Sequence, residues 1–187
     1  MQNVYESCPA FENERWLLRL ISKDDTADLL EVYSDKNALP FFNSDNCDGD
    51  NFYYPTMERM QQAVDFWDYS YKYKWFVRWA IVDKSAGKAV GTIEMFQRLS
   101  DDDFDKAGVI RVDLGSTYER AEVIYEILSL IIPSGYEMFG CDRIISKVPI
   151  YAVERQEAFS RYGFEKTDSV LVAKDGAAFN GYWIIRK

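Results

Sequence analysis

Two apolar runs, residues 75–82 and 89–98, are joined by a polar turn containing Gly87. Short apolar runs on either side of a glycine turn are typical of paired strands, so they predict a β-hairpin. Gly91 lies in its second strand. Further apolar runs predict strands over residues 15–21, 109–114, 143–148, 169–173 and 178–185.

Apolar residues at three- and four-residue spacing predict four helices. A first helix over residues 23–35 has Ser22 as its expected N-cap, with acidic residues in its first turn. The second helix is expected over residues 56–73, the third after Thr117, and the fourth over residues 153–162.

Two segments interrupt this pattern. Residues 37–55 are polar and rich in turn formers, which predicts a loop with at most one short helical turn. Pro133 is expected to break or kink the third helix near its end, because proline removes a backbone donor.

No repeat or linker divides the chain, so residues 1–187 are expected to form one domain with a sizeable core.

The charge balance excludes some partners. The chain carries 22 basic and 31 acidic residues, a formal net charge of −9, so bulk attraction to nucleic acid or to an anionic membrane is not expected. A cationic partner is favoured instead. No apolar run is long enough to span a membrane, and the first residues do not resemble a signal peptide, which predicts a cytoplasmic location.

Histidine is absent, which excludes Ser-His-Asp and Cys-His mechanisms and most zinc enzymes. Cys8, Cys47 and Cys141 have no paired spacing, so free thiols and no metal site are expected. A general base must therefore be a carboxylate, tyrosine, cysteine, lysine or a held water. Aromatic residues make up 16% of the chain and are expected either in the core or along a cleft.

The order of predicted elements is the most specific feature. A hairpin is followed by a strand, a helix, a short strand, a helix and an RYGF turn at residues 161–164. This order, over roughly residues 14–185, resembles the GNAT N-acetyltransferases, particularly the branch that acetylates protein N-termini and related small amines. The resemblance implies an α+β fold with a mixed, mostly antiparallel sheet of six to seven strands and helices on both faces.

The resemblance also implies a cofactor and a reaction. Acetyl-CoA lies in that fold in a V-shaped opening between two central parallel strands, and backbone groups of the strand that carries Val112 and Leu114 would contact the pantetheine arm. The acetyl group would pass to a primary amine of a small cationic molecule or a peptide N-terminus. The resemblance is compatible with a monomer or a homodimer.

The pyrophosphate loop departs from the family pattern. Aligning the family pattern Y-R-G-x-G-x-A-x-E-A-L on Tyr118 places the loop at residues 119–124. The glycines of the family pattern let the backbone approach an anion at a helix start. Glu119 replaces a basic or amide residue, and Glu122 replaces the middle glycine. Like charges about 4 Å apart repel by about 4 kcal/mol at an effective dielectric of 20, which is roughly 10³ in affinity.

The cofactor contacts expected from this alignment are nevertheless assigned position by position. Arg120 is expected to offset part of the repulsion by reaching the phosphates with its side chain. The family pattern N-x-x-S before the last long helix falls on Ala152 and Arg155. The complete set of expected cofactor contacts is Val112, Leu114, Glu119, Arg120, Ala121, Glu122, Val123 and Arg155.

Three residues are candidates for proton transfer. Glu94 and Asp113 are the expected bases, and period-two alternation places Glu94 on one face with Thr92 and Phe96. An ion pair with Arg111 is the alternative role for Asp113. A family tyrosine acid would fall on Phe159, so Tyr151 or Tyr162 would have to replace it, although Tyr162 suits packing in the RYGF turn.

Carboxylates also lie on the acceptor side. Asp45, Asp48 and Asp50 stand among aromatic residues of the loop 37–55, a combination that suits an ammonium group or a solvated loop.

The resemblance to the GNAT family leaves two functional hypotheses. The first is acetyl transfer from acetyl-CoA to a primary amine, and it is the working hypothesis. The alternative is a non-catalytic GNAT-fold protein that has lost CoA binding and acts as a binding or regulatory module.

Overall fold

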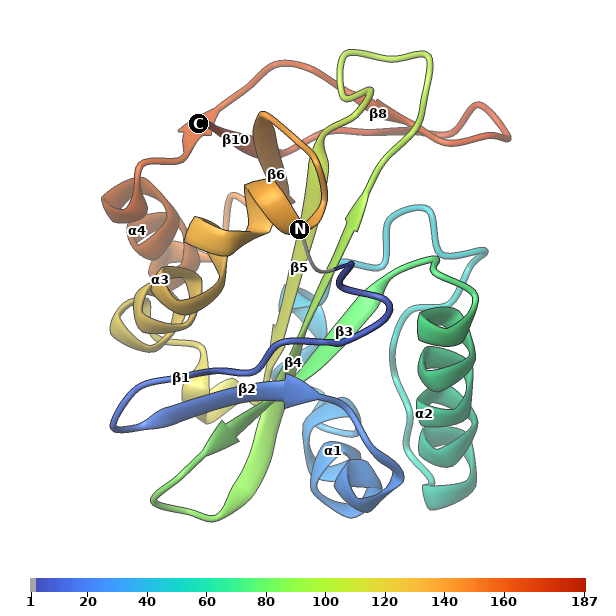
Figure 1. Cartoon of the computed structure of the whole chain (residues 1–187), viewed down its shortest axis with the longest axis vertical. Helices are drawn as coiled ribbons and strands as arrows, with labels where there is room; N and C mark the ends of the chain where they lie inside the picture. Colours follow the sequence, from blue (N-terminus) through green and yellow to red (C-terminus); the bar gives the residue numbers. More distant parts are fainter. Residues whose placement is uncertain (1–2) are drawn as a thin grey trace.

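The computed structural model describes residues 3–187 and contains a central sheet in the order β1-β2-β3-β4-β5-β6-β10-β7 (Figure 1). All neighbouring strands are antiparallel except β5 and β6. The strands of the sheet are β1 (Phe11–Glu12), β2 (Trp16–Leu20), β3 (Val77–Asp83), β4 (Lys88–Gln97), β5 (Gly108–Leu114), β6 (Arg143–Lys147), β7 (Glu165–Lys166) and β10 (Tyr182–Arg186).

Four α-helices cover the two faces of the sheet (Figure 1). They are α1 (Thr26–Tyr33), α2 (Met57–Lys72), α3 (Ala121–Met138) and α4 (Val153–Tyr162). The first two pack on one face and the last two on the other. The expected α+β fold is confirmed, and the sheet has eight strands because the two-residue strands β1 and β7 extend its edges.

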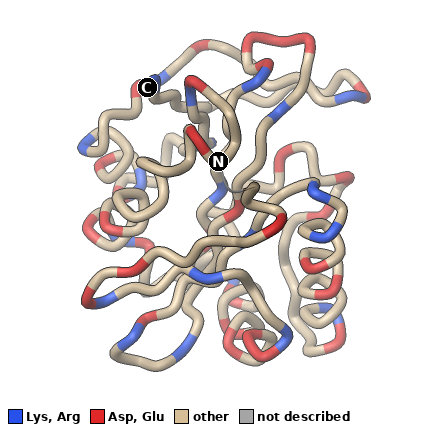
Figure 2. The backbone as a smooth tube through the Cα atoms, in the orientation of Figure 1, with Lys and Arg blue, Asp and Glu red and all other residues tan. Residues whose placement is uncertain are grey.

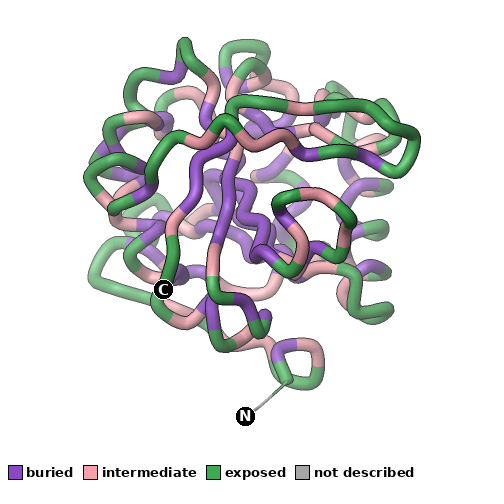
Figure 3. The backbone as a smooth tube through the Cα atoms, turned by 90° about the horizontal axis from the view of Figure 1, so that it is seen from above, coloured by how far each residue is buried: buried purple, intermediate pink, exposed green. Residues whose placement is uncertain are grey.

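Side-chain alternation explains why both faces are covered. Trp79 and Ile81 of β3 join the core under α3, whereas Ala80 between them joins the core under α1 and α2. All seven residues of β5 are buried. The strands in the middle of the molecule are buried over most of their length, and exposed residues lie on loops and outer helix faces (Figure 3). A strand enclosed on both sides in this way can hold charged groups away from water.

Local sequence signals fix most helix ends. The Ser22 N–H donates to the Asp25 carboxylate at 2.8 Å, and a 3₁₀ turn, Lys23–Asp25, precedes α1. The Thr56 hydroxyl accepts the Arg59 N–H at 3.2 Å at the start of α2. Gly163 ends α4 with φ +110°, a conformation that favours glycine. The expected single turn within residues 37–55 is the 3₁₀ helix Leu39–Phe41.

Two expectations differ from the structure. The helix α3 is not broken at Pro133 but continues to Met138, because Ile131, Ile132 and Gly135 on either side of the proline are buried against the sheet. The last predicted strand is divided at Gly181, which has φ +81°. Its first part, β9 (Ala178–Phe179), pairs with β8 (Leu171–Val172) in a separate ribbon.

Acidic and basic residues both occur along the helices and loops of the backbone trace (Figure 2). Within residues 3–187, no helix combines the length and the apolar character that a bilayer crossing requires.

Candidate functional site

The parallel strands β5 and β6 separate after a short contact. They pair only at Gly108 with Ile144 and at Val109 with Ile145, while β5 continues to Leu114. The Ser146 hydroxyl donates to the Ile110 carbonyl at 2.9 Å just beyond the last pair. The opening expected between two central parallel strands is therefore present at this point of the sheet.

Arg155 of α4 fills the opening. Its Nη1 donates to the Val112 carbonyl at 2.9 Å, and its Nε and Nη2 each donate to a different oxygen of Glu119 at 2.7 Å. Arg155 is only 1% exposed and Glu119 8%. Burial alone would lower the pKa of Arg155, but the carboxylate of Glu119 outweighs it and the pKa is raised. The guanidinium is thus a buried cation with a bidentate carboxylate partner.

The start of α3 is closed by carboxylates of its own chain. The Ala121 N–H, in the first turn, donates to the Glu154 carboxylate at 2.6 Å. Glu122 pairs with Arg161 at 2.6 Å on the surface. This ion pair and the hydrogen bond between Ala121 and Glu154 both join α4 to α3. A helix start attracts anions, and here a side-chain carboxylate already takes that place.

These residues do not fit acetyl-CoA in this arrangement. The Val112 carbonyl, which a pantetheine amide would meet, already accepts the Arg155 guanidinium. Glu119 and Glu154 would face the diphosphate with like charge. Arg120, expected to reach the phosphates, is exposed and donates to the Thr117 carbonyl at 3.1 Å. The side chains of Leu114 and Val123 are buried in the apolar core beside this region.

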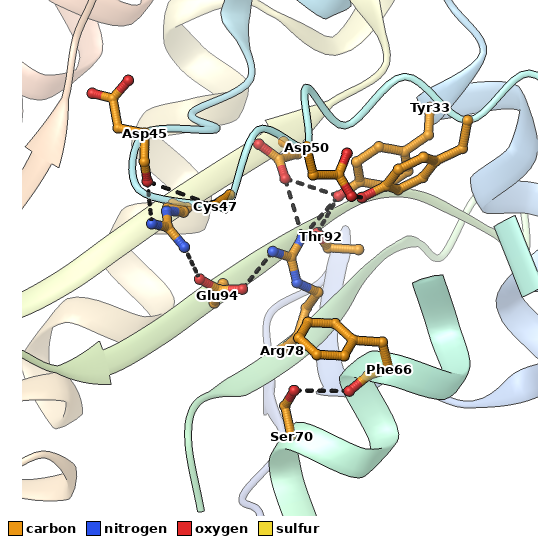
Figure 4. A network of polar contacts seen from close by, with 12 residues as sticks. Tyr33, Asp45, Cys47, Asp50, Phe66, Ser70, Arg78, Thr92 and Glu94 are labelled. Carbon is orange, nitrogen blue, oxygen red and sulfur yellow. Dashed lines mark hydrogen bonds and ion pairs between the residues drawn. The ribbon is translucent and has the colours of Figure 1, made fainter. Parts of the chain in front are cut away.

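The opposite face of the sheet carries a buried charge cluster (Figure 4). The Nη2 of Arg78, on β3, donates to Glu94 at 2.5 Å. The Nη1 of the same guanidinium contacts Tyr33, Thr92 and Asp113 at 2.9, 3.0 and 3.1 Å. Arg111 of β5 contacts the second oxygen of Glu94 at 2.5 Å. Glu94 therefore lies between two guanidinium groups and has no free oxygen.

The two carboxyl groups of this cluster are shifted in opposite directions. Burial alone would raise the pKa of Glu94, but Arg78 and Arg111 outweigh it and hold the pKa below its ordinary value. Burial raises the pKa of Asp113, and Arg78 and Tyr33 offset it only in part. The expected alternation that puts Glu94 on one face with Thr92 is confirmed, but the partner of Asp113 is Arg78 and not Arg111.

The charge cluster forms the floor of a cavity of about 550 Å³. Trp67 of α2 forms one wall and lies 4.2 Å from the Arg78 guanidinium carbon, measured to the ring centroid. Phe66 and Trp75 stand at the mouth, about half exposed. The aromatic residues that line the cavity are Phe52, Tyr54, Phe66, Trp67, Trp75, Phe76 and Phe96. This cleft contains part of the aromatic content of the chain.

The three acidic residues of the preceding loop have different surroundings. Asp45 contacts the Lys147 ammonium at 2.6 Å and accepts from the Tyr182 hydroxyl at 3.2 Å. Asp50 pairs with Arg59 at 2.6 Å. Asp48 is exposed, lines the cavity, and forms no ion pair with any of residues 3–187. Of the three, Asp48 alone offers an uncompensated carboxylate.

The two tyrosines lie in different environments. Tyr151 is 60% exposed, and its hydroxyl donates to the Pro40 carbonyl at 2.6 Å. Tyr162 packs against Tyr125 and Phe164, with ring centroids 6.0 and 6.2 Å away. Arg78 and Glu154 are not among the residues expected from the sequence. A charged residue between apolar neighbours in a strand, as in V-R-W at residues 77–79, is the signal that could have identified Arg78.

A family model described as an acetyltransferase (GNAT) domain matches residues 15–165, most of the chain. A comparison with curated proteins finds no match.

Several solved structures share the fold. A candidate ribosomal-protein-serine acetyltransferase from Vibrio cholerae superposes with a TM-score of 0.71 at 11% identity, covering 96% of this chain and 98% of that one. A ribosomal-protein-S5-alanine acetyltransferase from Vibrio fischeri gives 0.68 at 18% identity, covering 96% of each chain. A GNAT-family acetyltransferase from Bacillus anthracis gives 0.69 at 14% identity, covering 95% and 98%. At these identities the likeness concerns the fold.

Proposed function

This chain belongs to the GNAT acetyltransferase domain family, and we propose that in this member side chains replace acetyl-CoA, leaving a protein that binds an amine without acetylating it. The ligand is an amine-bearing small molecule or a peptide N-terminus, the acceptor class of the family. It occupies the cavity between α2, the loop before it and the sheet.

The single observation that carries this proposal is the buried pair of Arg155 and Glu119. A pantetheine arm entering between β5 and β6 would have to displace the guanidinium from the Val112 carbonyl and from Glu119. The displacement would leave a buried carboxylate without its partner, next to an incoming diphosphate. Both steps are unfavourable, and binding of the cofactor would have to offset them.

Titration calorimetry with acetyl-CoA tests the proposal. The wild type is expected to show no binding at millimolar cofactor and no gain in thermal stability. A ligand at 100 times its dissociation constant would add about 2.7 kcal/mol to the stability, which is readily detectable. Binding of acetyl-CoA by the wild type would refute the proposal.

A double variant, Arg155→Ser with Glu119→Gln, removes both charges together and leaves neither one unpaired in the interior. We expect it to gain measurable acetyl-CoA binding, because the opening is no longer filled. The matched control is Arg161→Ser with Glu122→Gln, which removes an exposed ion pair between the same two helices. The control is expected to stay without binding.

Acetyl transfer from acetyl-CoA to a primary amine is the second candidate function. It is favoured by the separation of β5 and β6 beyond Val109 and by the family to which the chain belongs. In that case Glu94 and Asp113 remain the predicted bases and Tyr151 the predicted acid. Binding of acetyl-CoA by the wild type, followed by acetylation of an amine, would support this function in place of the first.

A further inference from the structure

The floor of the cavity is lined by two cationic side chains, Arg78 and Arg111, and by one carboxylate, Glu94, which the two arginines share. Asp113, the second carboxylate in contact with Arg78, is not among the residues that line the cavity. The two arginines are 1% and 8% exposed, and the Nε of each is buried without a hydrogen-bond partner among residues 3–187. Buried N–H donors without acceptors are costly, so each of the two guanidinium groups retains one donor that no acceptor of the described chain satisfies.

The mouth of the cavity presents negative charge. Asp48 is exposed there and forms no ion pair within the described chain, whereas Asp50 beside it is held by Arg59. Its backbone has φ +52° in a loop where Asn46 and Phe52 also have positive φ. The floor and the mouth therefore favour groups of opposite charge.

The walls between floor and mouth are apolar. Phe52, Phe76 and Trp67 stand around the space above the arginines, and Phe66 and Trp75 continue this surface outward. Aromatic walls bury an apolar body, and the few charged groups of such a cavity fix its orientation.

We infer that this cavity binds an amine that also carries a carboxylate: an amino-acid-like zwitterion with an apolar side chain. The carboxylate accepts hydrogen bonds from Arg111 and Arg78, the ammonium group lies at Asp48, and the apolar body packs on the aromatic walls. The inference rests on the proposed function, because it names the class of amine that the proposed site takes. A peptide N-terminus, which lacks the neighbouring carboxylate, is expected to bind more weakly.

Calorimetry with two matched ligand sets tests the inference on the full-length protein at neutral pH. The first set is phenylalanine, phenylalaninamide and 3-phenylpropionate, and the second is leucine, leucinamide and 4-methylpentanoate. Within a set the body is constant, while the amide lacks the carboxylate and the acid lacks the amine. We expect one of the two amino acids to bind at least about 10-fold more tightly than both of its analogues, which is the effect of one charged contact of about 1.4 kcal/mol.

Asp48→Asn provides a variant that is expected to fold normally, because asparagine tolerates a positive φ and the residue is exposed. It should weaken binding of the amino acid and leave binding of the matching acid unchanged. Asp175→Asn, an exposed residue in the turn between β8 and β9, is the matched control and should change neither.

The outcomes separate this inference from the proposed function. An amide or an acid that binds as tightly as its amino acid would overturn the inference, and so would the absence of binding by both amino acids. None of these results depends on acetyl-CoA. Conversely, acetyl-CoA binding by the wild type would overturn the proposed function and leave amino-acid recognition at this cavity to stand or fall on the ligand sets.

Discussion

Glu94 shows how one residue can be read in two ways. A carboxylate on the second hairpin strand suits a general base, but each of its oxygens contacts an arginine at 2.5 Å. The pKa of Glu94 is held below its ordinary value as a result, and a base with a low pKa accepts protons poorly near neutral pH. Its physical role in this arrangement is to compensate two buried cations.

That role predicts a large loss of stability for Glu94→Gln. The change leaves Arg111 without an anionic partner in the interior and leaves Arg78 with Asp113 alone, and removing one member of a buried ion network costs about 3 kcal/mol or more. Urea unfolding followed by circular dichroism measures the loss. The control is Glu31→Gln, which breaks an exposed pair with Lys88 and should cost less than about 1 kcal/mol. Equal losses in the two variants would contradict the prediction.

The sequence was sufficient to place Glu94 but not its partners. Period-two alternation puts Glu94 on the face with Thr92, and the hydrogen bonds of Arg78 to both residues agree. The partners lie 16 residues before and 17 residues after it, on different strands. Which arginine meets which carboxylate depends on strand register, and a single sequence does not specify that register.

The elements themselves were predicted more completely, because their signals are local. The fourth helix was predicted over residues 153–162, and α4 has those bounds. Its position over the opening between β5 and β6 could not be predicted, since Arg155 and Glu119 are 36 residues apart. The strands β1 and β7 escaped prediction because a two-residue strand has no measurable period.

Substitutions of Gly91 and Gly163 test two different reasons for glycine at a position: close contact between strands and a positive φ. A Cβ at Gly91 of β4 would lie 2.2 Å from the Asp113 carbonyl of β5, so Gly91→Ala must push the two strands apart. Gly163 has φ +110°, but an added Cβ would only make an ordinary contact of 3.6 Å with Ile185, so Gly163→Ala meets only backbone strain. We expect losses of about 3 kcal/mol or more for the first and about 1–2 kcal/mol for the second in urea unfolding.

Gly115 provides the control for both glycine variants. It has φ −57°, and the nearest atom to an added Cβ is 3.7 Å away. Gly115→Ala should therefore change the free energy of unfolding by less than about 0.5 kcal/mol, or stabilise slightly by restricting the unfolded chain. A Gly163→Ala variant more destabilised than Gly91→Ala would show that backbone strain outweighs strand contact here.

At the scale of the whole molecule, charge is divided between an acidic exterior and a balanced interior. The chain has a net charge of −9, while the buried cluster pairs Arg78 and Arg111 with Glu94 and Asp113. On the other face Arg155 is paired with Glu119. The fold therefore encloses ion pairs on both sides of one sheet, and its stability depends on the protonation of their carboxylates.

This dependence predicts that acid unfolds the protein. The pKa of Glu94 is lowered in the folded state by Arg78 and Arg111 despite burial, and that of Asp25 by Arg19 and Ser22 despite burial, so near pH 4 the unfolded chain binds more protons. Their stabilisation is complete above the unfolded pKa values of about 4 and is lost as the pH falls through the lower folded values.

Asp113 acts in the opposite direction, because its raised pKa lets the folded state take up a proton first. We expect the losses to outweigh this gain, so the urea midpoint should fall between pH 5 and 3, as estimated from those reference values. Glu94→Gln should show a shallower fall, and a midpoint that rises on acidification would mean that Asp113 dominates.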